Sequence, residues 1–320
     1  MIVQEQIKHE WKQFGSILAF PYGWQQPAKT EQWVYEQLLT RNLDYSYAEY
    51  IAFPWATLID LLDRKQEDKA QVYLEALKDL PAKKVFKRVT ACQHIHLSSA
   101  VELMKKIGIT DIFWAHKQID QDLIEQMRIE PLALYPVAYF EVPMIKPEII
   151  AKRKYLYSFI GAYDPGCYTS DIRITIFDIN PREDILIKKR KRWHFEDQVY
   201  KAQIYGEKLT YDDLNEQKRL MQEYSDVLSN TVFSLCPSGA GPNSIRYWES
   251  LAFGCIPVLL SDRLELPSFG QQEIRLMENQ ISELDSLLIE KKSFYIDNHI
   301  SQNEKIVDRF LSNLFDFLKI

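Results

Sequence analysis

The stretch TVFSLCPSGAGPNSIRYWESLAFGCIPVLLSD, residues 231–262, decides the fold of this chain. Its β-rich run Thr231–Cys236 predicts a buried strand, and small residues follow as a loop. Asn243–Phe253 predicts a helix, and Ile256–Leu260 predicts the next strand. Strand, loop, helix and strand in this order indicate a unit of parallel β/α structure.

The loop of this unit, Pro237–Pro242, can bring bare backbone close to a ligand. Asn243 or Ser244 is expected to cap the helix, and the free N–H groups of its first turn favour a phosphate. Glu249, further along the helix, could accept both hydroxyls of a ribose. The alternative is an ordinary loop, with Glu249 paired to Arg246 three residues away, and the residues alone leave the two interpretations even.

The rest of the chain continues the β/α alternation on both sides. Strands are predicted at 16–20, 49–55, 85–92, 111–115, 132–140, 155–160 and 185–187, and helices at 31–39, 66–80, 98–107 and 211–227. The proline-containing stretch Glu141–Pro147 is expected to connect two domains. Apolar residues from Ile306 to Leu318 predict one face of a final helix.

Composition favours a protein of about two domains and disfavours one that binds nucleic acid. A chain of 320 residues with 46% hydrophobic residues fits about two domains. With 39 basic and 45 acidic side chains, a nucleic-acid partner is a poor expectation. The four cysteines form no Cys-x-x-Cys pair, and the first residues lack the pattern of a signal peptide, so we expect a cytoplasmic protein.

The decisive stretch resembles a known signature. Its Cys236, Pro237, Gly239, Arg246 and Glu249, followed by Gly-Cys-Ile-Pro-Val and Ser-Asp, are similar to the exostosin-like glycosyltransferases of family 47. YLYSFIG at 155–161 also resembles the first strand of that family's nucleotide domain. The sequence departs from the family at Ser238, where the exostosins often carry a basic residue.

The resemblance implies an α/β protein of the GT-B type, with two doubly wound Rossmann-like domains facing a central cleft. Residues 1–145 would form the acceptor-side domain and residues 146–303 the nucleotide-sugar-binding domain. Residues 304–320 would form a helix that packs back on the first domain.

The same resemblance implies an inverting transfer of a hexosyl or uronosyl group from a nucleotide-diphosphate sugar, with a UDP-type donor favoured. The acceptor would be a glycan or glycolipid, in the synthesis of surface polysaccharide or lipopolysaccharide. No metal and no further cofactor are expected, and the protein could contact the inner face of the cell membrane. The alternatives are a fucosyltransferase-like GT-B enzyme that uses GDP-fucose and a non-catalytic module that binds a nucleotide or glycan.

A leaving diphosphate must be stabilised by N–H groups and cations when no metal is bound. The predicted donor-binding residues are Gly161, Arg190, Arg192, Ser238, Gly239, Asn243, Ser244, Arg246 and Glu249. Arg190 and Arg192 belong to the basic run 188–192, which we expect to follow a strand. The alternative for this run is a solvated face or a contact with an anionic membrane.

An inverting transfer also needs a general base with a pKa near the working pH, which favours histidine. His94, His96 and His116 follow predicted strands of the first half. We choose His94 and His116 as the candidates, with Asp60 and Glu141 as rivals.

Overall fold

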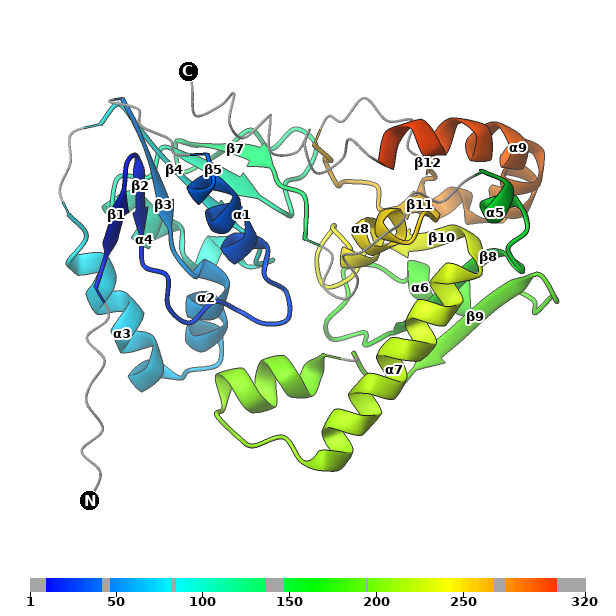
Figure 1. Ribbon diagram of the computed structural model, residues 1–320, viewed down its shortest axis with the longest axis horizontal. Helices are drawn as coiled ribbons and strands as arrows, with labels where there is room; N and C mark the ends of the chain where they lie inside the picture. Colours follow the sequence, from blue (N-terminus) through cyan, green and yellow to red (C-terminus); the bar gives the residue numbers. More distant parts are fainter. Residues whose placement is uncertain are drawn as a thin grey trace.

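The computed structural model describes residues 10–41, 47–81, 85–135, 147–193, 195–267 and 274–303. These residues form a mixed α/β structure with one seven-stranded and one five-stranded sheet. Figure 1 shows the strands β1–β7 in one part of the ribbon and β8–β12 in the other. Among the described residues, no helix has both the length and the apolar character needed to cross a membrane.

The first sheet has the order β1-β2-β3-β4-β5-β7-β6. Its strands are β1 (Lys12–Phe14), β2 (Ile17–Ala19), β3 (Ala48–Ala52), β4 (Lys87–Cys92), β5 (Asp111–Trp114), β6 (Leu123–Ile124) and β7 (Met127–Pro131). The five strands from β2 to β7 pair in parallel, and β1 and β6 close the edges as antiparallel partners.

Helices cover both faces of this sheet, as its parallel strands require. They are α1 (Thr30–Leu39), α2 (Trp55–Asp63), α3 (Glu67–Lys78), the 3₁₀ turn η1 (Leu97–Ser99) and α4 (Val101–Lys106). One hydrophobic cluster joins α1 to one face, and a second joins α2, α3 and α4 to the other. Leu58, Ile59 and Leu61 are all buried, because α2 is apolar on most of its surface.

The second sheet is parallel throughout, in the order β12-β11-β10-β8-β9. Its strands are β8 (Tyr155–Ala162), β9 (Ile185–Arg190), β10 (Thr231–Pro237), β11 (Ile256–Leu260) and β12 (Ile274–Arg275). The chain moves outward from β8 to β9 and then returns to place β10 on the other side of β8. The carboxyl ends of β8 and β10 therefore form the switch point at which such sheets bind ligands.

The helical elements of this half are α5 (Pro147–Ala151), α6 (Ile172–Phe177), the π-helix η2 (Asp197–Ile204), α7 (Tyr211–Ser229), α8 (Ile245–Ala252), η3 (Glu278–Glu283) and α9 (Leu284–Asn303). Local sequence explains where α7 begins. Thr210 accepts the N–H of Asp213 at 3.1 Å, and Asp213 accepts the N–H of Thr210 at 2.8 Å, which forms a capping box.

Helix α8 packs against both sheets. Its Tyr247, Trp248 and Leu251 belong to the hydrophobic cluster that also contains Val34 of α1 and Leu259 of β11. In Figure 1, α8 lies at the inner side of the second sheet, toward the first. The two sheets are thus joined by a shared apolar core as well as by the chain.

The predicted parallel β/α alternation is confirmed, but several elements differ. The strand predicted at 49–55 ends at Ala52, and α2 begins at Trp55 within the predicted range. The sequence pattern did not predict α2, α5, α6, α9, β1, β6, β7 or β12. The basic run was expected to follow a strand, which is wrong for Lys188–Arg190 because these residues belong to β9, an edge strand on which lysines are tolerated.

Three predictions fall largely or wholly outside the described residues. They are most of the connection 141–147 together with Glu141, most of the strand 132–140, and the final helix within 304–320.

Candidate active site

The strand ends of the two sheets meet around Gly241, in the loop after β10. A Cβ atom on Gly241 would lie 2.6 Å from His116 Nδ1 and 2.7 Å from Ile95 Cγ2. Ile95 follows β4 and His116 follows β5, so this glycine permits a close approach of loops from both sheets.

Asn243, predicted to contact phosphate, instead ties these loops together. Its Nδ2 donates to Ala115 O at 2.5 Å, its N–H donates to His116 Nδ1 at 3.3 Å, and its Oδ1 accepts from Trp248 at 3.2 Å. His116 is 5% exposed, and burial lowers its pKa to about 3. Its neutral ring acts as an acceptor inside the contact between the sheets.

Arg173 of α6 carries a positive charge to the switch point. It is 8% exposed, and its guanidinium donates to Ser238 O and to Ala162 O, both at 2.9 Å. Burial lowers its pKa to about 10, so it stays protonated at neutral pH. No carboxylate of the described residues lies within ion-pair distance of it, which leaves a buried cation with only carbonyl acceptors.

Arg246 of α8 adds a second guanidinium at the same strand ends. It donates to Ile160 O of β8, and its charge contributes to the lowered pKa of Arg173. No described carboxylate lies within ion-pair distance of it either, so the alternative of a pair with Glu249 is not what the structure shows. Two close cations that pair with no carboxylate in the described part of the chain favour an anionic ligand.

Glu249 lies beneath the surface on the same face of α8 as Arg246, since both side chains contact Tyr224. It is 1% exposed, and its Oε2 accepts the hydroxyl of Tyr224 at 2.8 Å. Burial raises its pKa, and Oε1 has no hydrogen-bond partner among the described residues.

The remaining small residues frame Arg173. Gly161 and Gly239 each lie where an added Cβ would come within 3.3 Å of its guanidinium. Ser238 contacts the hydroxyl of Ser170 at 3.0 Å and donates to Glu278 at 2.9 Å. Ser244 occupies the N-cap position of α8, as predicted, without a side-chain capping bond.

Arg190 and Arg192 are not gathered into this group by any contact that the structure describes. Arg190 donates to Leu220 O and to Glu223, under α7. Arg192 is exposed and pairs with Asp197 at 2.7 Å.

His94 belongs to a polar network at the carboxyl end of β4. Its Nε2 lies 3.4 Å from Asp60 Oδ1, and Gln25 donates to the other oxygen of Asp60. Gln93 donates to Gln25 at 2.8 Å. His96, two residues along, is more exposed and contacts Asp63.

The chain also pairs directly across the two sheets beyond β5 and β11. Ile119 N–H donates to Arg263 O at 2.8 Å, and Glu265 N–H donates to Lys117 O at 3.0 Å. Lys117 is 4% exposed, and its amino group pairs with Glu265 at 2.8 Å and Asp122 at 3.0 Å.

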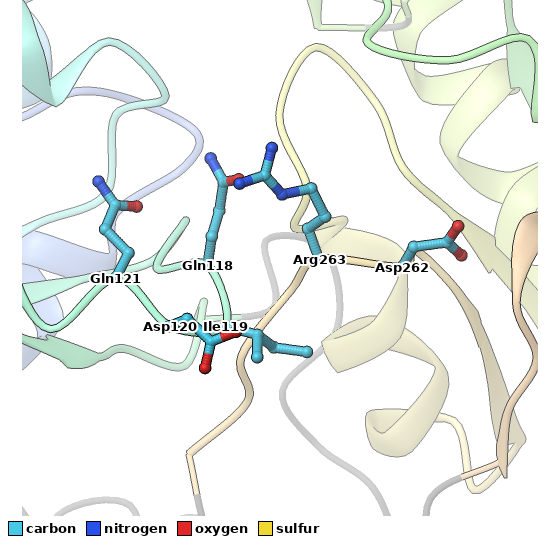
Figure 2. A pocket seen from close by; sticks show the side chains of 6 residues that line it. All are labelled: Gln118, Ile119, Asp120, Gln121, Asp262 and Arg263. Atoms are coloured by element: carbon cyan, nitrogen blue, oxygen red, sulfur yellow. The ribbon is translucent and has the colours of Figure 1, made fainter.

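A pocket of about 620 Å³ lies beside this pairing, lined by Gln118, Ile119, Asp120, Gln121, Asp262 and Arg263. Figure 2 shows Gln118 and Arg263 pointing the same way, while the carboxylate of Asp262 turns away from them. Amides, carboxylates and a guanidinium suit a ligand rich in hydroxyl groups.

The structure brings four of the predicted residues, Gly161, Ser238, Gly239 and Arg246, close to Arg173, which the sequence did not predict as a candidate. Arg173 lies in a polar segment without a glycine motif. Only the fold shows that it is buried and that no carboxylate of the described residues pairs with it.

The chain matches the family model "Exostosin GT47 domain" over residues 20–290. It is 32% identical over 120 residues to "Exostosin-1 homolog" of Caenorhabditis elegans, which covers 36% of this chain and 28% of that protein. It is 38% identical over 72 residues to "Probable glucuronosyltransferase GUT1" of Oryza sativa subsp. japonica, covering 21% and 17%. It is 37% identical over 70 residues to "Probable beta-1,4-xylosyltransferase IRX10" of Arabidopsis thaliana, covering 20% and 17%. The matched segments thus span less than a third of each of these relatives.

Proposed function

Since the chain belongs to the exostosin GT47 family, we propose that it is a glycosyltransferase that moves a sugar from a nucleotide-diphosphate donor to a glycan acceptor, with inversion at the anomeric carbon. The observation that carries the proposal is the pair of guanidinium groups of Arg173 and Arg246 at the ends of β8 and β10, without carboxylate partners among the described residues. The names of the relatives favour a uronosyl or pentosyl group as the transferred sugar.

On the donor side, the diphosphate would bind at Arg173, Arg246 and the loop of Ser238 and Gly239. As the bond from the anomeric carbon to the diphosphate breaks, its electron pair leaves with the diphosphate oxygen. The two preorganised cations would stabilise that charge. The unpartnered Oε1 of Glu249 would accept a ribose hydroxyl, which keeps the role predicted from the sequence.

On the acceptor side, we assign the acceptor hydroxyl to the cluster of Asp60, His94 and His96. The oxygen of the acceptor would attack the face opposite the leaving group, and its proton would pass to this cluster. Of the two predicted bases, His94 fits this position, because Asp60 holds its ring. His116 fits it less well, since its ring is buried and already accepts the N–H of Asn243.

The arrangement of the sheets supports a GT-B fold. Parallel sheets with helices on both faces and their strand ends turned toward each other match what that fold requires. The pocket lined by Gln118 and Arg263 would extend the acceptor site with groups that bind sugar hydroxyls. Synthesis of a surface polysaccharide is the process that we propose for the product.

The test is a panel of UDP- and GDP-sugars, measured first by thermal shift and then by release of the nucleoside diphosphate in the presence of oligosaccharide acceptors. We expect a UDP-sugar to stabilise the protein and to be consumed, with the product anomer opposite to that of the donor by NMR. Stabilisation by GDP-fucose alone would indicate the fucosyltransferase alternative. Binding of UDP without turnover of any donor would indicate a non-catalytic module.

A further inference from the structure

Two histidines and one aspartate converge beside the site, outside the group that holds the donor. Asp63 ends α2, and His94 and His96 follow β4. Each offers one ligand atom, and these three atoms all lie within 4.8 Å of one another. His96 Nδ1 lies 2.6 Å from Asp63 Oδ2, and the two imidazole rings lie 5.3 Å apart at 72°.

Two imidazoles and a carboxylate are a typical ligand set for a divalent transition metal such as zinc. We propose that Asp63, His94 and His96 bind one such ion. Three protein ligands leave a coordination position for water or for an oxygen of a substrate, which is the pattern of catalytic rather than structural zinc sites.

The groups around the three ligands support this proposal. Metal-bound histidines usually present their second ring nitrogen to a carboxylate, and His94 Nε2 lies 3.4 Å from Asp60 Oδ1. Gln25 in turn donates to Asp60, and Ser99 donates to Asp63 Oδ1 at 3.0 Å. Asp60 therefore already orients His94, and Ser99 already orients Asp63.

The hydrogen bonds of His94 also select the tautomer that a metal needs. Its Nδ1 accepts the N–H of His96 at 3.0 Å, so the ring proton lies on Nε2, toward Asp60, and Nδ1 carries a lone pair. An ion would replace this hydrogen bond and the contact between His96 and Asp63. His96 and Asp63 are exposed, so an ion can enter from solvent.

The three ligands lie next to the loop of the proposed donor site, but the metal site does not depend on the transfer reaction. Ile95, between the two histidines, packs against Gly241 of the loop after β10. If the proposed transfer holds, the ion would bind the acceptor oxygen and lower the pKa of its hydroxyl, and Asp60 of the same cluster would take the proton in place of the metal-bound His94. Metal binding itself is independent of that reaction and is measured without a sugar donor.

The experiment uses the full chain with Cys167→Ser, because that exposed free thiol could bind metal by itself. The protein is treated with a chelator, and Co²⁺ and Zn²⁺ are titrated separately, followed by visible absorption for Co²⁺ and by calorimetry for Zn²⁺. We expect one ion per chain and the absorption of a cobalt site with nitrogen ligands. His96→Ala and Asp63→Asn, both at exposed positions, should each weaken binding at least about tenfold.

Asp226→Asn on α7 is the matched control, since that carboxylate is exposed and should leave the affinity unchanged. His94→Gln is measured with circular dichroism to establish that it is folded. Failure of both ions to bind, or binding that survives His96→Ala and Asp63→Asn, would overturn the metal site. Neither result would contradict the proposed donor site, which is tested separately by nucleotide binding.

Discussion

At the scale of single residues, Arg173 determines what the strand ends can bind. Its charge is buried against carbonyl oxygens, which satisfy the guanidinium only in part and leave its charge for a ligand. A ligand with two phosphates would supply the anionic partner that the guanidinium lacks among the described residues. We therefore expect Arg173→Ala to weaken binding of UDP by about ten- to a hundredfold, the range that charged hydrogen bonds give.

Isothermal titration calorimetry with UDP checks this expectation, with Arg219→Ala as the control because Arg219 is exposed on α7 and, within the described ranges, forms its ion pair with Glu216. Arg173→Lys keeps the charge but cannot make both carbonyl contacts. Its affinity for UDP should therefore lie between those of the unchanged protein and Arg173→Ala. Equal UDP affinity of Arg173→Ala and the unchanged protein would show that the diphosphate does not bind at Arg173.

The sequence predicted some residues of the site for local reasons and missed others for non-local ones. Ser238, Gly239 and Arg246 fall in one strand-loop-helix motif, so their neighbourhood follows from their spacing. Asn243 shares that spacing, yet its polar atoms are used by Ala115, His116 and Trp248, which come from another sheet or a later turn. Likewise the His-x-His spacing was visible, but Asp63 joins it only through the pairing of distant segments.

Glu31 of α1 gives a pH-dependent prediction at the same scale. Its buried carboxyl accepts the N–H groups of Gln93 at 3.0 Å and Ala56 at 3.2 Å, and burial raises its pKa from 4.5 to about 8. The folded state thus holds a proton that the unfolded chain releases above pH 4.5. The stability linked to Glu31 is complete below that pH and is lost as the pH rises through about 8.

We expect Glu31→Gln to gain free energy of unfolding relative to the unchanged protein between pH 5 and pH 8.5, by about 2 kcal/mol or more, since one pKa unit is worth about 1.4 kcal/mol. Urea denaturation at the two pH values measures this difference. Glu36→Gln, at an exposed position of the same helix, is the control whose curve should run parallel to that of the unchanged protein. A parallel curve for Glu31→Gln as well would show that Glu31 is ionised in the folded state.

At the scale of elements, the loop after β10 depends on a single missing side chain. An alanine at Gly241 would place its Cβ within 2.7 Å of the His116 ring and Ile95. Both neighbours belong to loops that are fixed in the contact between the sheets, so the overpacking should cost about 1–3 kcal/mol of stability. The displaced loop should also bind UDP more weakly.

Thermal denaturation and UDP titration of Gly241→Ala test this together. Gly166→Ala is the control, because its Cβ would meet only Asp164 Oδ1 at 3.4 Å, an ordinary contact. If Gly241→Ala is as stable as Gly166→Ala, the close approach of the two loops is not a constraint on the fold.

The elements that the sequence predicted well are those with a strong pattern and a clear end. Strand β10 and helix α8 followed from a β-rich run and from Gly254, which ends the helix with φ +61°. Helix α2 was hidden because its apolar residues run on from the strand before it without a break in hydrophobicity. Strand β9 extends into the basic run because an edge strand lets the neighbouring Lys188 and Lys189 both reach water.

At the scale of the whole molecule, the repeated β/α pattern predicts parallel sheets, whereas it does not predict the tightness of the contact between the two sheets. The cluster that contains Val34 and Leu259 joins both sheets, because the apolar face of α8 is buried on the side of α1. Nothing in a periodic pattern says which neighbour an apolar face meets. The backbone pairing of 117–119 with 263–265 is equally invisible in sequence.

This pairing is held by Lys117, whose amino group is buried yet keeps a raised pKa because Glu265 and Asp122 accept its hydrogen bonds. Glu265→Ala would leave the buried cation with Asp122 alone. We expect a loss of about 1–3 kcal/mol in the free energy of unfolding, since a charged buried group would lose a partner. The contact between the sheets should loosen as well, which would lower the cooperativity of unfolding in urea.

The control for Glu265→Ala is Glu125→Ala, which removes the exposed partner of Lys105 and should cost at most about 1 kcal/mol. Urea denaturation followed by tryptophan fluorescence and by circular dichroism distinguishes the two effects. Coincident curves with an unchanged slope for Glu265→Ala would mean that the shared core around α8 alone holds the two sheets together. Separated curves would mean that the sheets unfold in turn once the Lys117 pairing is broken, as the burial of that amino group implies.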